Sequence, residues 1–453
     1  KSNCEEYELC GKCGYLCSSE KINNEKCKCD EKYKITVYKV KSNSMKNNIN
    51  ECPNCLHHQK NGIVRSINIG KDEATAILAQ LLYKAIDNNE PEKTTDYKTV
   101  LFKRNETLKM AKEPYVKQFI TFSDSRQQAS FFASFFEGNH ERFLRKRIIW
   151  EIIKNNNYQT IKFDNLLSQL DALIRKYNLF TNKKISSNKQ AWITALYELL
   201  NIDGNYSAEG LGLFHFTLDL DDLFEEISEE DISNEFGKYN INKPDLKNII
   251  NVLFNIFRTT PAIEYNISGL NNSEKQEYLS YRRFDNYIKL KKQPSSKRNE
   301  TETKYNNIRS LLPVYSSRDN MYTKYIMKVA QCSHEEACNI IEIIFNEIGV
   351  EGNICESGNS ISDEVYQISA SKYKLDNYKN TQYYICSNCG QLTIYNVHNV
   401  CTNKDCNGIL KECDPDKIFE NNYYRKEYQT KKIERINIKE HTAQLSQATA
   451  KEY

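Results

Sequence analysis

The 453-residue chain lacks features that would assign it to a class at once. It has no apolar stretch approaching the ~20 residues of a membrane-spanning helix, and no charged-then-apolar signal segment at its start. It also lacks a strong net charge, because 63 Lys and Arg against 60 Asp and Glu leave only +3. These absences exclude a globally basic nucleic-acid binder and predict a soluble, cytoplasmic protein with no membrane partner.

A phosphate-binding loop is missing as well. The pair Gly70-Lys71 lacks the earlier glycine and the following Ser or Thr, and no GxxxxGK[ST] occurs in the chain. The first residue is Lys rather than Met and the last segment is polar, so we expect an internal piece of a longer protein. At roughly 100 to 200 residues per domain, the length predicts about three domains.

Cysteine, by contrast, is abundant, with 16 residues gathered mostly in pairs at the two ends of the chain. In a long chain this arrangement favours zinc over disulfides. Near the C-terminus, four thiolates have the spacing that closes a tetrahedron around Zn²⁺. Gly390 and Gly408 supply turns in which backbone amides approach sulfur. The predicted ligands are Cys386, Cys389, Cys401 and Cys406.

A second zinc site is predicted near the N-terminus. Its expected ligands are the two CxxC pairs Cys10, Cys13, Cys52 and Cys55. Ligand substitution or a further metal remains open here, because other thiols and imidazoles lie nearby in the sequence: Cys4, Cys17, Cys27, Cys29, His57 and His58. About two structural zinc ions with four protein ligands each leave no open position for substrate, so no catalytic residue is predicted. The remaining thiols are interpreted as packing residues: Cys332, Cys338, Cys355 and Cys413.

The middle of the chain has mostly helical patterns. Residues 66–115 are predicted as a helical connector after an N-terminal zinc ribbon at 1–65, and residues 151–304 as a helical insertion. Within the insertion, "LDLDDLFEEISEED" is interpreted as a solvated helix face rather than a partner-binding site. The basic stretch "RRFDNYIKLKKQ" is either a solvated linker or a track for a phosphate backbone.

Residues 305–378 resemble a winged-helix-like module that precedes a C-terminal zinc ribbon at 379–415. One helix is expected around Tyr325 to Val329. Ser333 and Glu336 form a capping box for a second helix, which ends at Gly349 and is followed by the β segment "EVYQIS". Because the second helix carries several glutamates, we expect structural spacing rather than DNA reading from this module.

One segment, "KQFITFSDSRQQASFFASFFE", combines a strand, a polar turn and a helix at 117–137. The run up to Phe122 suits a buried parallel strand, and Ser125 with Gln128 forms a capping box. Such turns lie where α/β sheets bind ligands, and free amides at a helix start favour phosphate. Ser123, Ser125 and Arg126 are therefore predicted to contact a nucleic-acid backbone, although Arg126 also fits a surface ion pair.

These residues resemble a known family. "FITFSDSRQQASFFASFFE" is similar to motif IV, which opens the second RecA-like lobe of superfamily 2 DEAD/DEAH-box helicases, and "INIKEHTAQLS" is similar to a later segment of that lobe. The resemblance is to large bacterial helicases with zinc-binding cysteines, found in anti-phage defence systems such as Druantia and DISARM and in related DNA-repair helicases. In that group a cysteine-rich segment and residues like "IGKDEA" precede motif IV.

The resemblance implies that residues 116–150 start the second RecA-like lobe and residues 428–453 return to it. Strands at 118–122 and 433–439 would then be parallel neighbours. The residues implied to line the DNA path are Ser123, Asp124, Ser125, Arg126, His441, Thr442 and Gln444. The chain departs from the family in having no Walker A lysine, no DEAD or DEAH acid pair and no closing arginine motif.

The expected fold is therefore α/β with a large, mostly α insertion: a partial RecA-like parallel sheet, a winged-helix-like module and two zinc ribbons. The expected function is part of an ATP-dependent superfamily 2 DNA helicase or translocase in anti-phage defence or DNA repair. ATP and Mg²⁺ would be bound by the parent protein, and partners would be DNA, the remainder of the helicase chain and defence-system proteins. The alternative is a non-enzymatic zinc-ribbon and winged-helix scaffold that binds a protein or nucleic acid.

Overall fold

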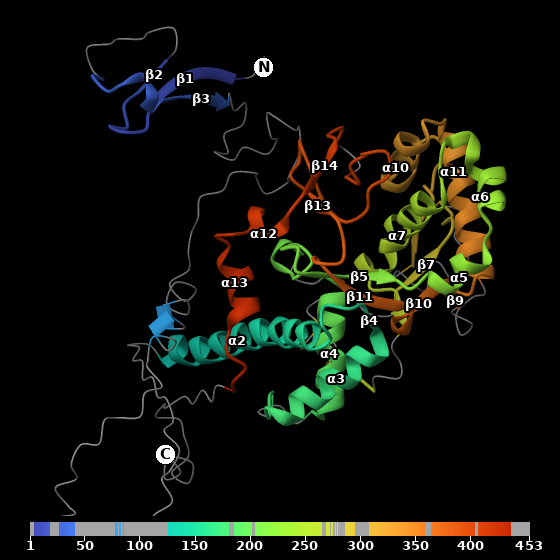
Figure 1. Cartoon of the computed structure of the whole chain (residues 1–453), viewed down its shortest axis with the longest axis horizontal. Helices are drawn as coiled ribbons and strands as arrows, with labels where there is room; N and C mark the ends of the chain where they lie inside the picture. Colours follow the sequence, from blue (N-terminus) through green and yellow to red (C-terminus); the bar gives the residue numbers. More distant parts are fainter. Residues whose placement is uncertain are drawn as a thin grey trace, which may run out of the picture. The chain divides into compact units, whose positions relative to one another are not determined.

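The computed structural model describes part of the chain in detail (Figure 1). The described residues are 4–18, 27–40, 78–79, 81–82, 85, 126–180, 185–201, 204–264, 269–271, 273–274, 277, 279, 286–294, 308–357, 364–403 and 406–435. The chain divides into two compact units, one formed by Lys1–Arg65 with Leu144–Arg435 and the other by Ser66–Phe143 with Ile436–Tyr453. We call residues 144–435 the central region.

The N-terminal ribbon is a small antiparallel sheet with strand order β2-β1-β3. Its register sets Glu5 of β1 opposite Lys39 of β3. Lys34 forms an ion pair with Glu8 at 3.5 Å between Nζ and Oε1. The elements are β1 (Cys4–Cys10), β2 (Leu16–Ser18), η1 (Glu31–Tyr33) and β3 (Lys34–Val40).

The helix α2 (Arg126–Asn155) is 30 residues long and begins immediately after the Ser-Asp-Ser stretch, where the sequence predicted a helix start. Its second half is buried along most of its surface, including Leu144, Ile148 and Ile152. The helix therefore enters the central region as a core element rather than as a surface connector.

Helices α3 (Phe163–Lys176) and α4 (Ser187–Leu199) follow. In α3 the apolar residues recur at helical spacing, so Phe163, Leu166 and Leu170 are fully buried on one face. In α4 every residue from Gln190 onward is buried, which makes it an internal helix. Further helices cover the acidic segment and the core beyond it: η2 (Gly204–Tyr206), α5 (Asp221–Glu226), α6 (Glu229–Phe236), η3 (Gly237–Tyr239) and α7 (Lys243–Thr259).

One sheet of the central region has the order β4-β11-β5 and is antiparallel. Its strands are β4 (Ile161–Lys162), β5 (Phe214–Leu218) and β11 (Tyr373–Asn377). In β11 the buried residues alternate, which is the pattern of a strand with one face in the core. Because β11 lies beyond residue 305, this sheet joins the predicted helical insertion to the predicted winged-helix-like module.

A second sheet has the order β6-β10-β7-β8, and β9 also pairs with β10. The predicted segment "EVYQIS" contains β10, which pairs with β6 in parallel and with β7 and β9 in antiparallel fashion. It is thus shared with the insertion and is not a wing of a separate module. The strands are β6 (Ile263–Glu264), β7 (Tyr287–Lys289), β8 (Ile308–Ser310), β9 (Cys355–Ser357) and β10 (Tyr366–Ser369).

The two predicted helices of residues 305–378 are present. Helix α10 (Met321–Ala330) is followed by α11 (His334–Ile343), and Ser333 and Glu336 form the expected capping box. The helix does not stay α-helical to Gly349, because it continues as the π-helix η6 (Ile344–Glu351). A short 3₁₀ helix, η7 (Ala370–Lys372), then leads into β11.

The C-terminal ribbon consists of β12 (Tyr383–Cys386), β13 (Leu392–Thr393) and β14 (Leu410–Cys413), and helices α12 (Pro415–Ile418) and α13 (Tyr423–Thr430) follow it. Helix α13 lies against α2 (Figure 1). The Nζ of Lys146 lies 5.5 Å from the centre of the Tyr428 ring, and Nε of Arg147 donates to the carbonyl of Lys431 at 2.7 Å. The chain therefore leaves the central region beside the helix through which it entered.

The predicted strands of the RecA-like lobe are not tested. Residues 118–122 and 436–439 lie outside the described residues, and residues 433–435 are not part of a strand. The α/β class itself is confirmed, although strands are more widely distributed than a mostly α insertion implies. Among the described residues no helix has the length and apolar character that a membrane span requires.

Candidate metal centres

The C-terminal ribbon brings four cysteines together in the way the sequence predicted. Their Sγ atoms all lie within 4.8 Å of one another. Cys386 ends β12, Cys389 follows in the turn, and Cys401 and Cys406 come from the loop before β14. Sγ of Cys386 lies 3.6 Å from Sγ of Cys406, and Sγ of Cys389 lies 3.6 Å from Sγ of Cys401.

Backbone amides of both turns point at sulfur. The N–H groups of Asn388, Asn403 and Gly408 donate to the sulfurs of Cys386, Cys401 and Cys406 at 3.5, 3.5 and 3.3 Å. Hydrogen bonds of this kind stabilise a thiolate more than a thiol. Each turn therefore favours the charge state in which cysteine binds a metal.

Gly408 is required by close approach. A Cβ at this position would lie 2.5 Å from the Cys386 sulfur and 3.0 Å from the backbone nitrogen of Asn388. Gly390 is required by conformation instead, with a φ of +69° and nothing within 4 Å of an added Cβ. The two glycines that the sequence placed beside the ligands thus have different physical roles.

Side chains of the central region hold the C-terminal ribbon in place. Nζ of Lys328 in α10 donates to the carbonyl of Cys406 at 2.8 Å. The His398 ring contacts the carbonyls of Val329 and Asn240, each at 3.0 Å. Three of the four cysteines are buried, so the group is part of the packed structure rather than an exposed thiol cluster.

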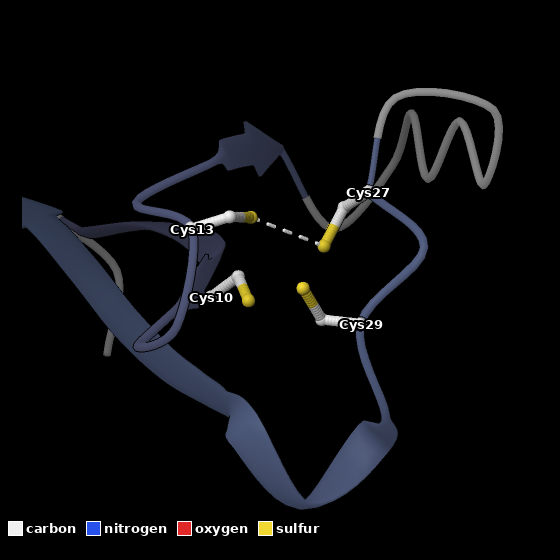
Figure 2. A group of neighbouring side chains, drawn as sticks. All are labelled: Cys10, Cys13, Cys27 and Cys29. Carbon is white, nitrogen blue, oxygen red and sulfur yellow. Dashed lines mark hydrogen bonds between the residues drawn. The ribbon is translucent and has the colours of Figure 1, made fainter.

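The N-terminal ribbon holds a second group of four cysteines, Cys10, Cys13, Cys27 and Cys29 (Figure 2). Their side chains point toward a common centre, with all Sγ atoms within 4.8 Å of one another. Sγ of Cys13 lies 3.5 Å from Sγ of Cys27. Cys10 ends β1, and Cys27 and Cys29 come from the segment just before η1.

The first turn of each group has the same backbone geometry. In the N-terminal ribbon, Cys10 N–H donates to the Tyr15 carbonyl at 2.8 Å and Gly14 N–H donates to the Cys10 carbonyl at 2.8 Å. In the C-terminal ribbon the corresponding bonds run from Cys386 to Gln391 and from Gly390 to Cys386, both at 3.0 Å. Gly14 and Gly390 have φ values of +73° and +69°. The sequence C-x-x-C-G therefore forms one type of turn at both ends of the chain.

The electrostatics of the two groups are similar. Hydrogen bonds from the backbone of Cys13 and Lys12 lower the pKa of Cys10 to about 6. Burial opposes ionisation of Cys386, but hydrogen bonds from the backbone of Cys389 and Asn388 lower its pKa to about 7. Burial and neighbouring thiols raise the pKa of Cys29 to about 12 and that of Cys401 further. One thiol of each group thus ionises readily, and full ionisation calls for a cation.

The geometry fits such a cation. A tetrahedron with Zn–S distances of ~2.3 Å places its sulfurs about 3.8 Å apart, close to the 3.5 and 3.6 Å separations in the two groups. A disulfide would need about 2.05 Å, and all of these thiols are free. Both groups could therefore hold a metal ion.

The sequence prediction was thus confirmed for the grouping at the C-terminus and differs from the structure at the N-terminus. Cys10 and Cys13 are joined by Cys27 and Cys29, which the sequence left open as substitutes, and a four-sulfur site has no position left for Cys52 or Cys55. Those two residues lie outside the described residues. The sequence does contain a signal for this grouping. The 14 positions between Cys13 and Cys27 are similar to the 12 positions between Cys389 and Cys401 in the other group.

The predicted nucleic-acid contacts remain a prediction. Arg126 is the first residue of α2, and the other six lie outside the residues that the structure describes: Ser123, Asp124, Ser125, His441, Thr442 and Gln444. Of the four predicted packing thiols, Cys355 is buried. Cys338 instead contacts a histidine.

Comparisons of the chain with protein-family models, with curated proteins and with solved structures find no match. The site is therefore interpreted from its own geometry.

Proposed function

We propose that each four-cysteine group binds one structural zinc ion and that the chain is a zinc-stabilised part of an ATP-dependent superfamily 2 DNA helicase or translocase. The observation that carries the zinc assignment is the convergence of four thiols twice, at separations that suit tetrahedral sulfur coordination. Zinc would cross-link each ribbon, and its four thiolates would leave no open position for chemistry. ATP and Mg²⁺ would be bound outside this chain.

The helicase assignment has architectural support. Residues 66–143 and 436–453 belong to one compact unit although about 290 residues separate them. The contact between Arg147 and Lys431 brings the entry and exit of the central region together. This is the arrangement expected where a large insertion interrupts a lobe, and it supports the proposal without testing the two segments that resemble helicase motifs.

Elemental analysis tests the zinc assignment. We expect about two zinc ions per chain, one lost in the Cys386→Ser/Cys401→Ser variant and the other lost in Cys27→Ser/Cys29→Ser. The matched control, Cys52→Ser/Cys55→Ser, should retain both ions. Loss of zinc in the control but not in Cys27→Ser/Cys29→Ser would restore the pairing predicted from the sequence.

Activity assays test the helicase assignment. This chain alone should release no phosphate from ATP, whereas a longer chain that supplies the nucleotide-binding motifs should be a DNA-stimulated ATPase. Binding of single-stranded DNA should weaken steeply with salt, because only backbone contacts are foreseen. An intact parent protein without ATPase activity would favour the non-enzymatic scaffold instead.

A further inference from the structure

Three side chains around the start of α11 form a connected chain of hydrogen bonds. The Sγ of Cys338 lies 3.5 Å from Nε2 of His334, one helical turn earlier. Nδ1 of the same ring lies 2.6 Å from a carboxylate oxygen of Asp319. A thiol, an imidazole and a carboxylate in this order are the components of an activated cysteine nucleophile.

The geometry favours nucleophilic chemistry over metal binding. His334 uses its two ring nitrogens for two different partners, so Asp319 and Cys338 lie on opposite sides of the imidazole and one ion cannot contact both. A carboxylate at Nδ1 holds the proton there and leaves Nε2 free to accept a proton from sulfur. Asp319 is a positioning residue in this arrangement.

The three residues are placed by well-defined local structure. Ser333 and Glu336 cap α11, and the i, i+4 spacing brings Cys338 under His334. Asp319 directly precedes Asn320, which caps α10 and donates to the Leu311 carbonyl at 2.6 Å. The side chains of His334 and Asp319 are 28% and 37% exposed, so a small molecule can reach the site.

The surrounding charges define how the site would work. Burial raises the pKa of Cys338, Asp319 and Glu342 raise it further, and Lys291 lowers it. The thiol is therefore protonated at rest and needs His334 as a base during attack.

We propose that Cys338, His334 and Asp319 form a site that accepts an acyl group from a thioester. The Cys338 sulfur bonds to the acyl carbon, and the bond from that carbon to the donor sulfur breaks. The thiol proton passes to Nε2 of His334 and then to the departing thiolate, so no oxidant or further reactant is required. Acyl transfer between two thiols suits a site with one base that takes and returns one proton. This inference does not depend on the zinc or helicase assignments.

The test is acylation of the zinc-loaded full chain by the small thioester S-acetyl-N-acetylcysteamine, followed by peptide mass spectrometry. Cys332 and Cys413 are internal comparators, because burial raises the pKa of both half-buried thiols. We expect Cys338 to be acylated at least tenfold faster than either of them. His334→Gln should slow Cys338 by ~10²-fold or more and leave the comparators unchanged. Asp319→Asn should slow it about tenfold or more, and Asp319→Glu should restore part of the rate.

A pH profile separates chemistry from structure. In His334→Gln the rate at Cys338 should follow ionisation of the thiol alone, whereas the native chain, with a base at Nε2, should keep a measurable rate where the thiol is protonated. Thermal unfolding of the variants should be close to that of the native chain, since the side chains of His334 and Asp319 are both partly exposed. Equal rates at Cys338 and the comparators, or an unchanged rate in His334→Gln, would overturn the proposal.

Discussion

At the scale of single residues, the metal centres depend on glycines as well as on cysteines. Gly408 lies where any Cβ would collide with the Cys386 sulfur and the Asn388 backbone. Gly390 only needs a left-handed conformation and has open space around it. The requirement for glycine is therefore steric at position 408 and conformational at position 390.

We therefore expect Gly408→Ala to lose zinc from the C-terminal group and Gly390→Ala to retain it. In Gly390→Ala the left-handed conformation should cost roughly 1 kcal/mol of stability. Zinc release in a chelator competition, measured beside the thermal unfolding midpoint, checks both variants. Equal zinc retention in the two would contradict the steric argument.

His215 provides a second test at this scale. It is fully buried in β5, and its Nδ1 lies 2.9 Å from the Tyr383 hydroxyl. Burial, assisted by the positive charge of Arg258, lowers the pKa of His215 to about 3. Because the unfolded chain binds a proton at about pH 6.5 and the folded chain does not, stability falls as the pH decreases below 6.5 and stops falling near 3.

The expected contribution is about 2 kcal/mol of lost unfolding free energy between pH 6.5 and 5, since each pH unit costs about 1.4 kcal/mol. His215→Gln keeps a polar group beside Tyr383 but cannot titrate, so its stability should change less over the same interval. Urea unfolding at the two pH values measures the difference. Identical pH dependence in both proteins would show that folding does not lower the pKa of His215.

At the scale of elements, α2 and α4 are joined by a buried ion pair. Nζ of Lys146 lies 2.8 Å from a carboxylate oxygen of Glu198, and both side chains are 2% exposed or less. Glu198 also accepts from the backbone of Ala208 at 3.1 Å. The charges are therefore fixed between two helices that form much of the core.

Removing one charge should be costly and removing both should be tolerated. Lys146→Met should destabilise the protein by ~3–5 kcal/mol, because it leaves a buried carboxylate without its ammonium, and Lys146→Met/Glu198→Gln should recover much of the loss. The matched control is Lys154→Met, which removes a half-exposed partner of Glu151 and should cost about 1 kcal/mol or less. Denaturant unfolding of the three variants provides the comparison, and a double variant no more stable than Lys146→Met would argue against coupling.

The elements also show what sequence patterns can and cannot determine. The capping box at Ser333 was identified correctly because it depends on two side chains three residues apart. The C-x-x-C-G turns are similarly local. The short strands β4 and β6 were missed, since each is two residues long and forms only where distant segments meet. The partner thiols of Cys10 were difficult to predict for the same reason. Several cysteine pairs lie close enough to Cys10 along the chain to join it in a metal site.

At the scale of the molecule, the sequence of the central region predicts several separate modules, whereas the structure forms one folded unit. The strand β11 pairs with strands from the predicted insertion, and β10 does so as well. Long-range pairing of this kind leaves no periodic pattern in the sequence. The return of α13 to α2, by contrast, follows the expectation that a long insertion ends near the point where it begins.

This topology predicts that residues 126–435 fold without the rest of the chain. Helix α2 would remain whole, and the described core of the two sheets would be retained. Arg147 and Lys431, near the two ends of the fragment, are in contact, so little entropy is lost in bringing the two ends together.

For this fragment we expect cooperative unfolding and about one zinc ion per chain, held by the C-terminal group. The same fragment with Cys386→Ser should contain no zinc and unfold at a lower temperature. Calorimetry and elemental analysis measure both properties. A fragment that binds zinc but shows no cooperative transition would mean that the central region needs residues outside it, and would count against its interpretation as an autonomous insertion.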